Sequence, residues 1–338
     1  MDLWGAFADV QPGSAGVADV TRIVVTDHAF ADLEHERAAA DRVGADFADH
    51  QCSEAQETIE AVRGAKVAFV NFAPIGPDQL AVMAPGATVI RYGVGVDNVD
   101  LEAARTHGVA VANVPDYGVD TVADHAAAHL LGLLRRIPTY DKGIRSEGWV
   151  RPPSVGPLRA FPRTTVGLVG AGRIARSLAD RLRPFGFTVI ATDPFVDEAT
   201  AASHGCELVS LDDLVERSDA ISLHVPVTTE TYHLVGNDFL SRVRPGCVIV
   251  NTSRGALIDE RALGAALSEG RVAGAGLDVF DPEPLALESP LRDCPGAVFT
   301  PHAAFYSDTS LDNLQRLAAE EAERAVRSEP LRCPVTTT

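Results

Sequence analysis

The chain has 338 residues, of which 46% are hydrophobic, and this length predicts a globular protein of two domains. Its formal net charge is −18, with 47 acidic residues against 29 Lys and Arg. The excess of acid argues against nucleic acid as a partner, because binding to a phosphate backbone depends on basic side chains.

The first half of the chain alternates strand and helix patterns. Residues 1–20 are expected to form a flexible extension, since no Lys or Arg precedes Arg22 and the positive region of a secretory signal is therefore missing. From residue 21, β-branched runs alternate with Ala-rich helical patterns, which predicts strands and helices around a parallel sheet. The strand runs are 21–27, 66–72, 87–93 and 109–115, and the helical patterns are 31–44, 53–64 and 100–108.

A long, mostly helical segment then runs from Thr121 to Arg145. Its most apolar part, residues 122–134, contains charged and imidazole side chains and is shorter than the roughly 20 residues that span a bilayer, so no membrane segment is expected. The alternation restarts after it, and a last amphipathic helix covers residues 308–329. The second set of strand runs is 164–170, 188–193, 220–226, 246–253, 272–280 and 296–302. The sequence therefore predicts two doubly wound α/β modules.

Neither a disulfide framework nor a metal site is expected. The five cysteines are odd in number, widely spaced and form no C-x-x-C pair, which predicts free thiols in a reducing cytoplasm. They are Cys52, Cys206, Cys247, Cys294 and Cys333. His125 and His129 are four residues apart on a predicted helix, as in some zinc sites, but no Glu lies between them and no third ligand is evident.

A glycine motif predicts the cofactor. Gly170, Gly172 and Ala175 form G-x-G-x-x-A between a strand run and a helical pattern, where glycines let a pyrophosphate approach the helix N-terminus. Asp193 follows Gly172 by 21 residues, the spacing of an acid that binds a ribose diol. It would repel the 2′-phosphate of NADP, and no Lys or Arg lies in residues 192–199, so NAD is expected. The alternative is a tight turn followed by an ordinary strand-ending Asp.

Longer motifs carry a family resemblance. The chain contains "YGVGVDNVDLEAARTHGVAVANVP", "GLVGAGRIAR", "LHVPVTTETYHLV", "VNTSRGALIDERALGAAL", "GLDVFDPEPL" and "TPHAAF". Over most of residues 85–325 it resembles the D-isomer-specific 2-hydroxyacid dehydrogenases. Within that family, "NVPDYGVDTVADH", "RYGVGVDNVD" and "TPHAAFYSD" are most similar to the C-terminal-binding protein corepressors and their bacterial relatives, which have Trp in place of Phe305.

The resemblance implies a fold of two doubly wound parallel-sheet domains. A Rossmann NAD-binding domain, residues 119–307, would be inserted into a flavodoxin-like substrate-binding domain of residues 21–118 and 308–338. It also implies a homodimer formed through the helix of residues 121–145, whose alternative role is an internal core helix. The implied activity is NAD-dependent reduction of a small 2-keto acid to the D-2-hydroxy acid in the cytoplasm.

Three residues match the family's active-site motifs: Arg254, Glu283 and His302. A planar arginine fork suits the carboxylate of a 2-keto acid and polarises its carbonyl. The alkoxide made by hydride transfer needs a proton, which an imidazolium held by Glu283 could donate. Taken singly, each residue has an ordinary alternative: Arg254 could cap a strand or pair with Asp259, Glu283 could be a solvated loop carboxylate, and His302 could be a core histidine.

Further contacts follow from the resemblance. The implied cofactor contacts are Thr121, Arg173, Ile174, Val225, Pro226, Thr252, Ser253 and Asp278, and Asp278 would accept from the nicotinamide amide. The implied substrate contacts are Arg91, the backbone of Gly93, Val94 and Gly95, and Phe305. Arg91 could equally be a surface charge.

Two other functions stay open. One is an NAD(H)-sensing binding protein that recruits short peptides, as the corepressors do. The other is oxidation of phosphite or use of a phosphonate-type substrate. Formate oxidation is disfavoured, because the formate enzymes have Gln at the position of Glu283.

Overall fold

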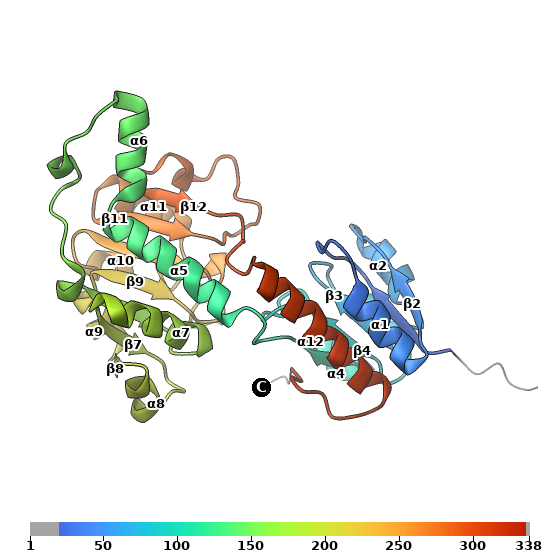
Figure 1. The fold of residues 1–338 in the computed structure, drawn as a ribbon. Helices are drawn as coiled ribbons and strands as arrows, with labels where there is room; N and C mark the ends of the chain where they lie inside the picture. Colours follow the sequence, from blue (N-terminus) through green and yellow to red (C-terminus); the bar gives the residue numbers. More distant parts are fainter. Residues whose placement is uncertain (1–19, 336–338) are drawn as a thin grey trace, which may run out of the picture. The chain divides into compact units, whose positions relative to one another are not determined.

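The fold comprises two compact units, seen in a computed structural model that describes residues 20–335 (Figure 1). The expected extension, residues 1–20, lies outside the described range except for Val20. The five-stranded unit contains residues up to 92, 96–113 and the chain from 315 onward, and the seven-stranded unit contains 93–95 and 114–314. The chain thus changes unit at 92/93, 95/96, 113/114 and 314/315. The sequence placed the domain boundaries at 118/119 and 307/308.

The five-stranded unit has a parallel sheet in the order β2-β1-β3-β4-β5, the flavodoxin-like arrangement. Its central strand β3 is buried along its whole length, as expected where helices cover both faces of a parallel sheet. The strands are β1 (Arg22–Val25), β2 (Asp46–Asp49), β3 (Val67–Val70), β4 (Thr88–Arg91) and β5 (Ala110–Ala112). The helices are α1 (Glu34–Val43), α2 (Ala55–Val62), α3 (Pro77–Ala81), α4 (Leu101–His107) and the part of α12 (Asp308–Val326) from residue 315.

The seven-stranded unit has a parallel sheet in the order β12-β11-β10-β9-β6-β7-β8, a Rossmann arrangement with one added strand. Its strands are β6 (Thr165–Val169), β7 (Thr188–Thr192), β8 (Cys206–Leu208), β9 (Ala220–Leu223), β10 (Cys247–Asn251), β11 (Val272–Leu277) and β12 (Ala297–Phe299). Its helices are α5 (Val119–Leu134), α6 (Ile137–Glu147), α7 (Arg173–Leu182), α8 (Glu198–Ser203), α9 (Leu211–Arg217), α10 (Asn237–Arg242) and α11 (Glu260–Ser268). Short 3-10 turns are η1 (Pro152–Val155), η2 (Phe161–Arg163), η3 (Arg183–Phe185), η4 (Gly255–Leu257) and η5 (Pro290–Asp293).

Helices cover both faces of the seven-stranded sheet. Helices α5 and α7 lie side by side on one face and share a core that includes Ala126, Leu130 and Leu178 (Figure 1). Helices α9, α10 and α11 pack on the other face. Each fully buried leucine stabilises such a layer by roughly 2 kcal/mol, so the two layers hold the strand ends in fixed positions. No helix within residues 20–335 is long and apolar enough to cross a membrane.

The structure corrects two details of the sequence prediction. The helical segment of residues 121–145 is two helices, because Arg136 adopts a left-handed conformation with φ of 56° and Pro138 follows at the start of α6. The strands β2 and β8, which the alternation did not indicate, lie at the sheet edges.

Candidate active site

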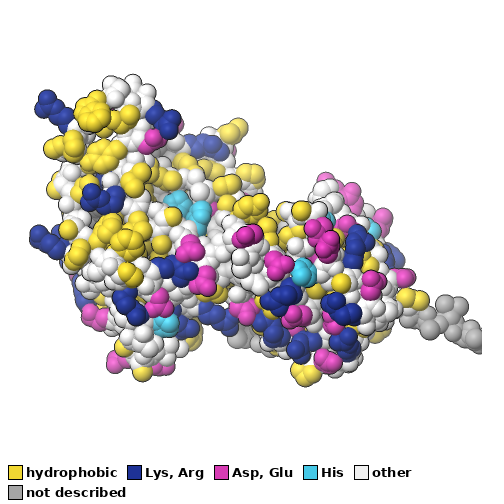
Figure 2. Space-filling model, viewed as in Figure 1, with side chains coloured by type: hydrophobic (Ala, Val, Ile, Leu, Met, Phe, Trp, Pro, Cys, Tyr) yellow, Lys and Arg dark blue, Asp and Glu magenta, His cyan; other side chains and the backbone are white. Residues whose placement is uncertain are grey.

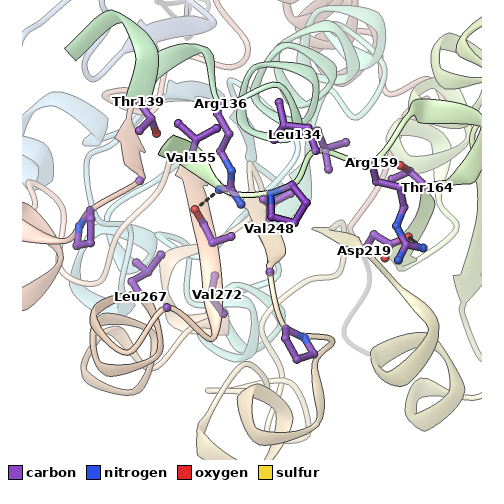
Figure 3. A pocket seen from close by; sticks show the side chains of 18 of the residues that line it. Leu134, Arg136, Thr139, Val155, Arg159, Thr164, Asp219, Val248, Leu267 and Val272 are labelled. Carbon is purple, nitrogen blue, oxygen red and sulfur yellow. Dashed lines mark hydrogen bonds and ion pairs between the residues drawn. The ribbon is translucent and has the colours of Figure 1, made fainter. Parts of the chain in front are cut away.

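One pocket of the seven-stranded unit lies at the amino-terminal ends of the sheet's strands. This pocket of about 900 Å³ is lined by Asp219, Gly246 and Gly296, which precede β9, β10 and β12 (Figure 3). Within it Arg136 donates a hydrogen bond to the carbonyl of Ala273. No residue predicted to bind cofactor or substrate lines this pocket. The candidate site therefore lies at the opposite edge of the sheet, where the carboxyl ends of the strands meet.

The glycine turn lies at that edge, between β6 and α7. Gly170 has φ of 94°, and a Cβ there would lie 2.6 Å from the carbonyl oxygen of His224. Only glycine therefore fits, and the backbone of β6 can turn directly into the helix. Gly172 is the N-cap of α7, and Arg173 and Ile174 are the first two residues of that helix. Free N–H groups at this N-terminus suit a pyrophosphate.

Asp193 ties the end of β7 to the glycine turn. Its Oδ2 accepts a hydrogen bond from the N–H of Ala171 at 2.8 Å, and its Oδ1 accepts from the N–H of Phe195 at 2.8 Å. A carboxylate has about four acceptor positions, so it can also accept from ribose hydroxyls. The predicted ribose ligand is thus fixed beside the predicted pyrophosphate turn.

Other predicted cofactor contacts follow β9 and β10. Ser253 donates to the carbonyl of Val225 at 2.7 Å, which links the two strand ends, and Pro226 comes next. The Thr252 hydroxyl is buried and has no hydrogen-bond partner among residues 20–335. An unsatisfied buried hydroxyl costs stability, so this edge fits a bound group that supplies a polar partner, as the amide of NAD would. The Thr121 hydroxyl, near the start of α5, lies 2.9 Å from the Ser307 hydroxyl.

The structure places His302 and Glu283 in direct contact. The Nδ1 atom of His302 lies 2.8 Å from Oε2 of Glu283, and both side chains are about one-third exposed. Burial raises the pKa of the Glu283 carboxyl, but hydrogen bonds from His302 and the Phe280 N–H, with the charges of His302 and Arg254, bring that pKa below its usual value. Glu283 is therefore ionised at neutral pH, and the Nε2 atom of His302 is left for a substrate.

Arg254 comes three residues after β10. The next residue, Gly255, packs closely on Phe280 and so brings Arg254 to the loop that contains Glu283. A Cβ on Gly255 would lie 2.0 Å from the carbonyl carbon of Phe280, so the backbones after β10 and β11 are in contact. The Arg254 carbonyl accepts from the Asn251 side chain at 2.8 Å, and its Nη1 donates to the Ser253 carbonyl at 2.7 Å. These bonds hold the arginine at the same edge as the histidine.

Asp278 is buried behind this edge. It is inaccessible to solvent, and its carboxylate accepts three hydrogen bonds from residues 300–304. The structure thus gives it a role in shaping the His302 turn, in addition to the predicted contact with the nicotinamide amide. Sequence reasoning missed two of its neighbours, Thr300 and His125; the signal available for Thr300 was its place two residues before His302.

The predicted substrate contacts are distributed over both units. In the seven-stranded unit, the Phe305 ring lies 6.4 Å from the rings of His302 and Tyr117. Gly93, Val94 and Gly95 also belong to this unit, where the Gly93 carbonyl accepts from Val114 at 2.9 Å. Arg91 is the last residue of β4 in the five-stranded unit.

Comparison with known proteins agrees with this geometry. The model of the D-isomer specific 2-hydroxyacid dehydrogenase NAD binding domain matches residues 127–304, which include the glycine turn and all three predicted catalytic residues. The chain belongs to the D-isomer specific 2-hydroxyacid dehydrogenase family. NAD is accordingly its cofactor, as the glycine turn and Asp193 predicted. The nearer likeness to the corepressor branch stays a prediction from the motifs.

Individual members of the family show the extent of the likeness. The D-3-phosphoglycerate dehydrogenase of Mycobacterium tuberculosis is 41% identical over 272 residues, 80% of this chain and 51% of the relative. The chain thus spans about half the length of the curated relatives it matches. The TT0316 protein of Thermus thermophilus has a TM-score of 0.81 and 32% identity over 94% of this chain and 100% of its own. Aquifex aeolicus D-lactate dehydrogenase, in complex with NAD and lactic acid, has a TM-score of 0.79 and 27% identity over 91% of this chain and 96% of its own.

Proposed function

We propose that the chain is an NAD(H)-dependent reductase that converts a small 2-keto acid to the D-2-hydroxy acid. The observation that carries this proposal is the 2.8 Å contact between His302 and an ionised Glu283, beside Arg254 at the edge that holds the glycine turn. The family membership supports the same reaction class, since the relatives include D-3-phosphoglycerate and D-lactate dehydrogenases.

The residues divide the chemistry between them. Bound NADH supplies the hydride. Arg254 would hold the substrate carboxylate with two parallel hydrogen bonds and withdraw charge from the adjacent carbonyl. His302 would donate its Nε2 proton to the carbonyl oxygen as negative charge develops there, because its Nδ1 faces Glu283. Glu283 would orient the ring and stabilise its protonated form.

The substrate contacts are part of the proposal. We place Arg91, Gly93, Val94, Gly95 and Phe305 among the groups that bind the acid. A second anionic group on the substrate would suit the two arginines, Arg91 and Arg254. A phosphorylated acid, as in the mycobacterial relatives, therefore belongs in any substrate panel.

A substrate and cofactor screen tests the proposed function. Purified protein is expected to oxidise NADH with at least one of glyoxylate, pyruvate and 3-phosphohydroxypyruvate. The carboxylate of Asp193 would repel a 2′-phosphate, so kcat/KM with NADPH is expected to be about 100-fold lower. Absorbance at the NADH band gives both rates. Tight NADH binding without turnover on any 2-keto acid would contradict the proposal and favour the corepressor-like alternative.

We also propose a homodimer formed through α5 and α6. None of the eleven residues of α6 is buried within the described chain. Ile137 and Ile144 on α6 and Trp149 just after it are 59%, 40% and 76% exposed, and Figure 2 shows hydrophobic side chains gathered over this end of the unit. Exposed apolar surface of this kind is typical of an interface. Two copies of the chain present the same surface, so it can pair with itself across a two-fold axis.

The dimer can be measured directly. Light scattering is expected to give twice the 35.7 kDa mass of one chain. The double variant Ile144→Asp and Trp149→Ser places a charge and a small polar group on the proposed interface, and it is expected to give the mass of one chain. A single-chain mass for the parent would refute the proposal. The matched control is Tyr306→Ser, which removes an aromatic that is 69% exposed outside α5 and α6.

A further inference from the structure

The turn that carries His302 is folded around the buried carboxylate of Asp278. Its Oδ1 accepts hydrogen bonds from the Thr300 hydroxyl at 2.6 Å and the Ala303 N–H at 2.8 Å. Its Oδ2 accepts from the Ala304 N–H at 2.9 Å, and its backbone oxygen accepts from the His302 N–H at 2.7 Å. The carboxylate is 1% exposed. A buried charge must be satisfied by hydrogen bonds, so this turn and Asp278 fix each other's position.

The turn needs this support because His302 has an unfavourable backbone conformation. Its φ is 51°, in the left-handed region. A residue with a side chain is strained there, and such a conformation persists only where the surroundings hold it. The contact between His302 Nδ1 and Glu283 therefore depends on the bonds that shape the turn.

The Thr300 hydroxyl connects the turn to helix α5. Its oxygen lies 2.9 Å from Nε2 of His125 and 3.3 Å from Nε2 of His129. A carboxylate only accepts hydrogen bonds, so the single proton of Thr300 is directed to Asp278. The two histidine contacts must then be donated by the rings, each from an Nε2–H. The geometry thus defines the tautomer of both histidines.

The two histidines differ in their surroundings. Burial, and then the charge of His125, lower the pKa of His129 to about 4, so His129 is neutral at neutral pH. The His125 side chain is 25% exposed, makes the shorter contact with Thr300 and lies 3.7 Å from the Asp278 carboxylate. His125 is therefore the stronger of the two donors.

We propose that His125 is a positioning residue that, through Thr300 and Asp278, sets the orientation of His302 toward Glu283 and the substrate. By donating to the Thr300 oxygen, His125 keeps the Thr300 proton on Asp278, which in turn holds the three N–H groups of the turn. His125 and His129, whose spacing resembles that of a zinc pair, would thus belong to the hydrogen-bond network that supports His302. The inference rests on the proposed function, in which His302 donates the proton.

The first test separates donation from packing. His125→Leu keeps the approximate volume and removes the donor, whereas His125→Gln keeps an N–H donor at a similar reach. With NADH and the best acid of the panel, the Leu variant is expected to lower kcat about tenfold with an unchanged KM for NADH, because the proton donor is misplaced. The Gln variant is expected to retain most of the kcat. Equal losses in both variants would overturn the proposal.

A double-mutant cycle tests the connection through Thr300. Thr300→Val removes the hydroxyl at constant shape and is expected to lower kcat at least as much as His125→Leu. Once Thr300 is replaced, a histidine at position 125 has no hydroxyl to donate to. The double variant is therefore expected to have the same kcat as Thr300→Val alone. Additive losses would mean that His125 acts elsewhere. His107→Leu, an exposed helical histidine in α4, is the control, and thermal unfolding shows whether each variant is folded.

A spectroscopic measurement is independent of turnover. In protein labelled with ¹⁵N histidine, two-bond ¹H–¹⁵N correlation spectra report the tautomer and hydrogen bonding of each ring, assigned by single substitutions. His125 and His129 are expected to show an Nε2–H tautomer, and the His302 Nδ1 signal is expected to move in His125→Leu and not in His125→Gln. An unmoved His302 signal would overturn the positioning role even if the enzyme turns over. Absence of turnover in the parent would refute the proposed function and leave this measurement valid.

Discussion

Replacing Arg254 by alanine is expected to lower kcat/KM for a 2-keto acid about 10³-fold. Two charge-assisted hydrogen bonds to the substrate carboxylate would be lost, each worth about 2 kcal/mol, and every 1.4 kcal/mol corresponds to a factor of ten. Arg254→Lys keeps the charge but loses the planar fork, so a smaller loss of about 10²-fold is expected. The measurement is steady-state NADH oxidation at pH 7.

A control distinguishes this effect from a general loss of charge. Arg261, on the first turn of α11, is exposed, and Arg261→Ala is expected to leave kcat/KM unchanged. NADH binding by Arg254→Ala, measured by fluorescence titration, is expected to match the parent, because the fork acts on the acid. If Arg254→Ala retains kcat/KM within tenfold of the parent, Arg254 does not hold the carboxylate.

The second large effect is expected at the His302 and Glu283 pair. His302→Asn removes the proton donor and is expected to lower kcat for reduction about 10³-fold, within the range of general acid catalysis. Glu283→Gln keeps the shape and removes the charge. Reduction needs the protonated imidazole, so its rate falls as pH rises, and the ionised Glu283 extends the active range upward. In Glu283→Gln the upper pH limit of reduction is therefore expected to move down.

The chain contains a matched control for this pair. His204 and Asp180 also make a 2.8 Å contact and are similarly exposed, at 33% and 43%, but they lie on the α7 and α8 side of the unit. Asp180→Asn is expected to leave the pH profile of reduction unchanged. A profile that is the same in Glu283→Gln and the parent would show that Glu283 does not act on the proton donor.

The sequence predicts most of the strands and misses two of the four edge strands, β2 and β8. Buried central strands are largely apolar runs, VAFV in β3 and CVIVN in β10, because helices cover both faces. The edge strands β2 and β8 are four and three residues long, with the sequences DFAD and CEL, and Cys206 is their only buried residue. Such short polar segments have no periodicity that marks a strand, and their pairing is decided by the neighbouring strand.

The sequence predicts which residues form the candidate site better than it predicts the contacts between them. The chemistry of Arg254, Glu283 and His302 could be inferred from their motifs, as could the proximity of three strand ends. The backbone conformation of His302 could not, because it depends on Asp278, 24 residues earlier. The four-residue spacing of His125 and His129 places them on one helix face, but it does not indicate their contact with Thr300, which joins segments that the sequence does not relate.

The contact between Gly255 and Phe280 has a consequence for how substrate preference can change. Because the backbones meet there without an intervening side chain, the spacing between the arginine and the acidic loop cannot be altered by a change of rotamer. The reacting groups would thus keep one geometry while residues around them are exchanged for larger, smaller or charged ones. A chain built in this way can acquire a new acid as substrate by exchanging the walls of its pocket, with hydride and proton still delivered from the same two directions.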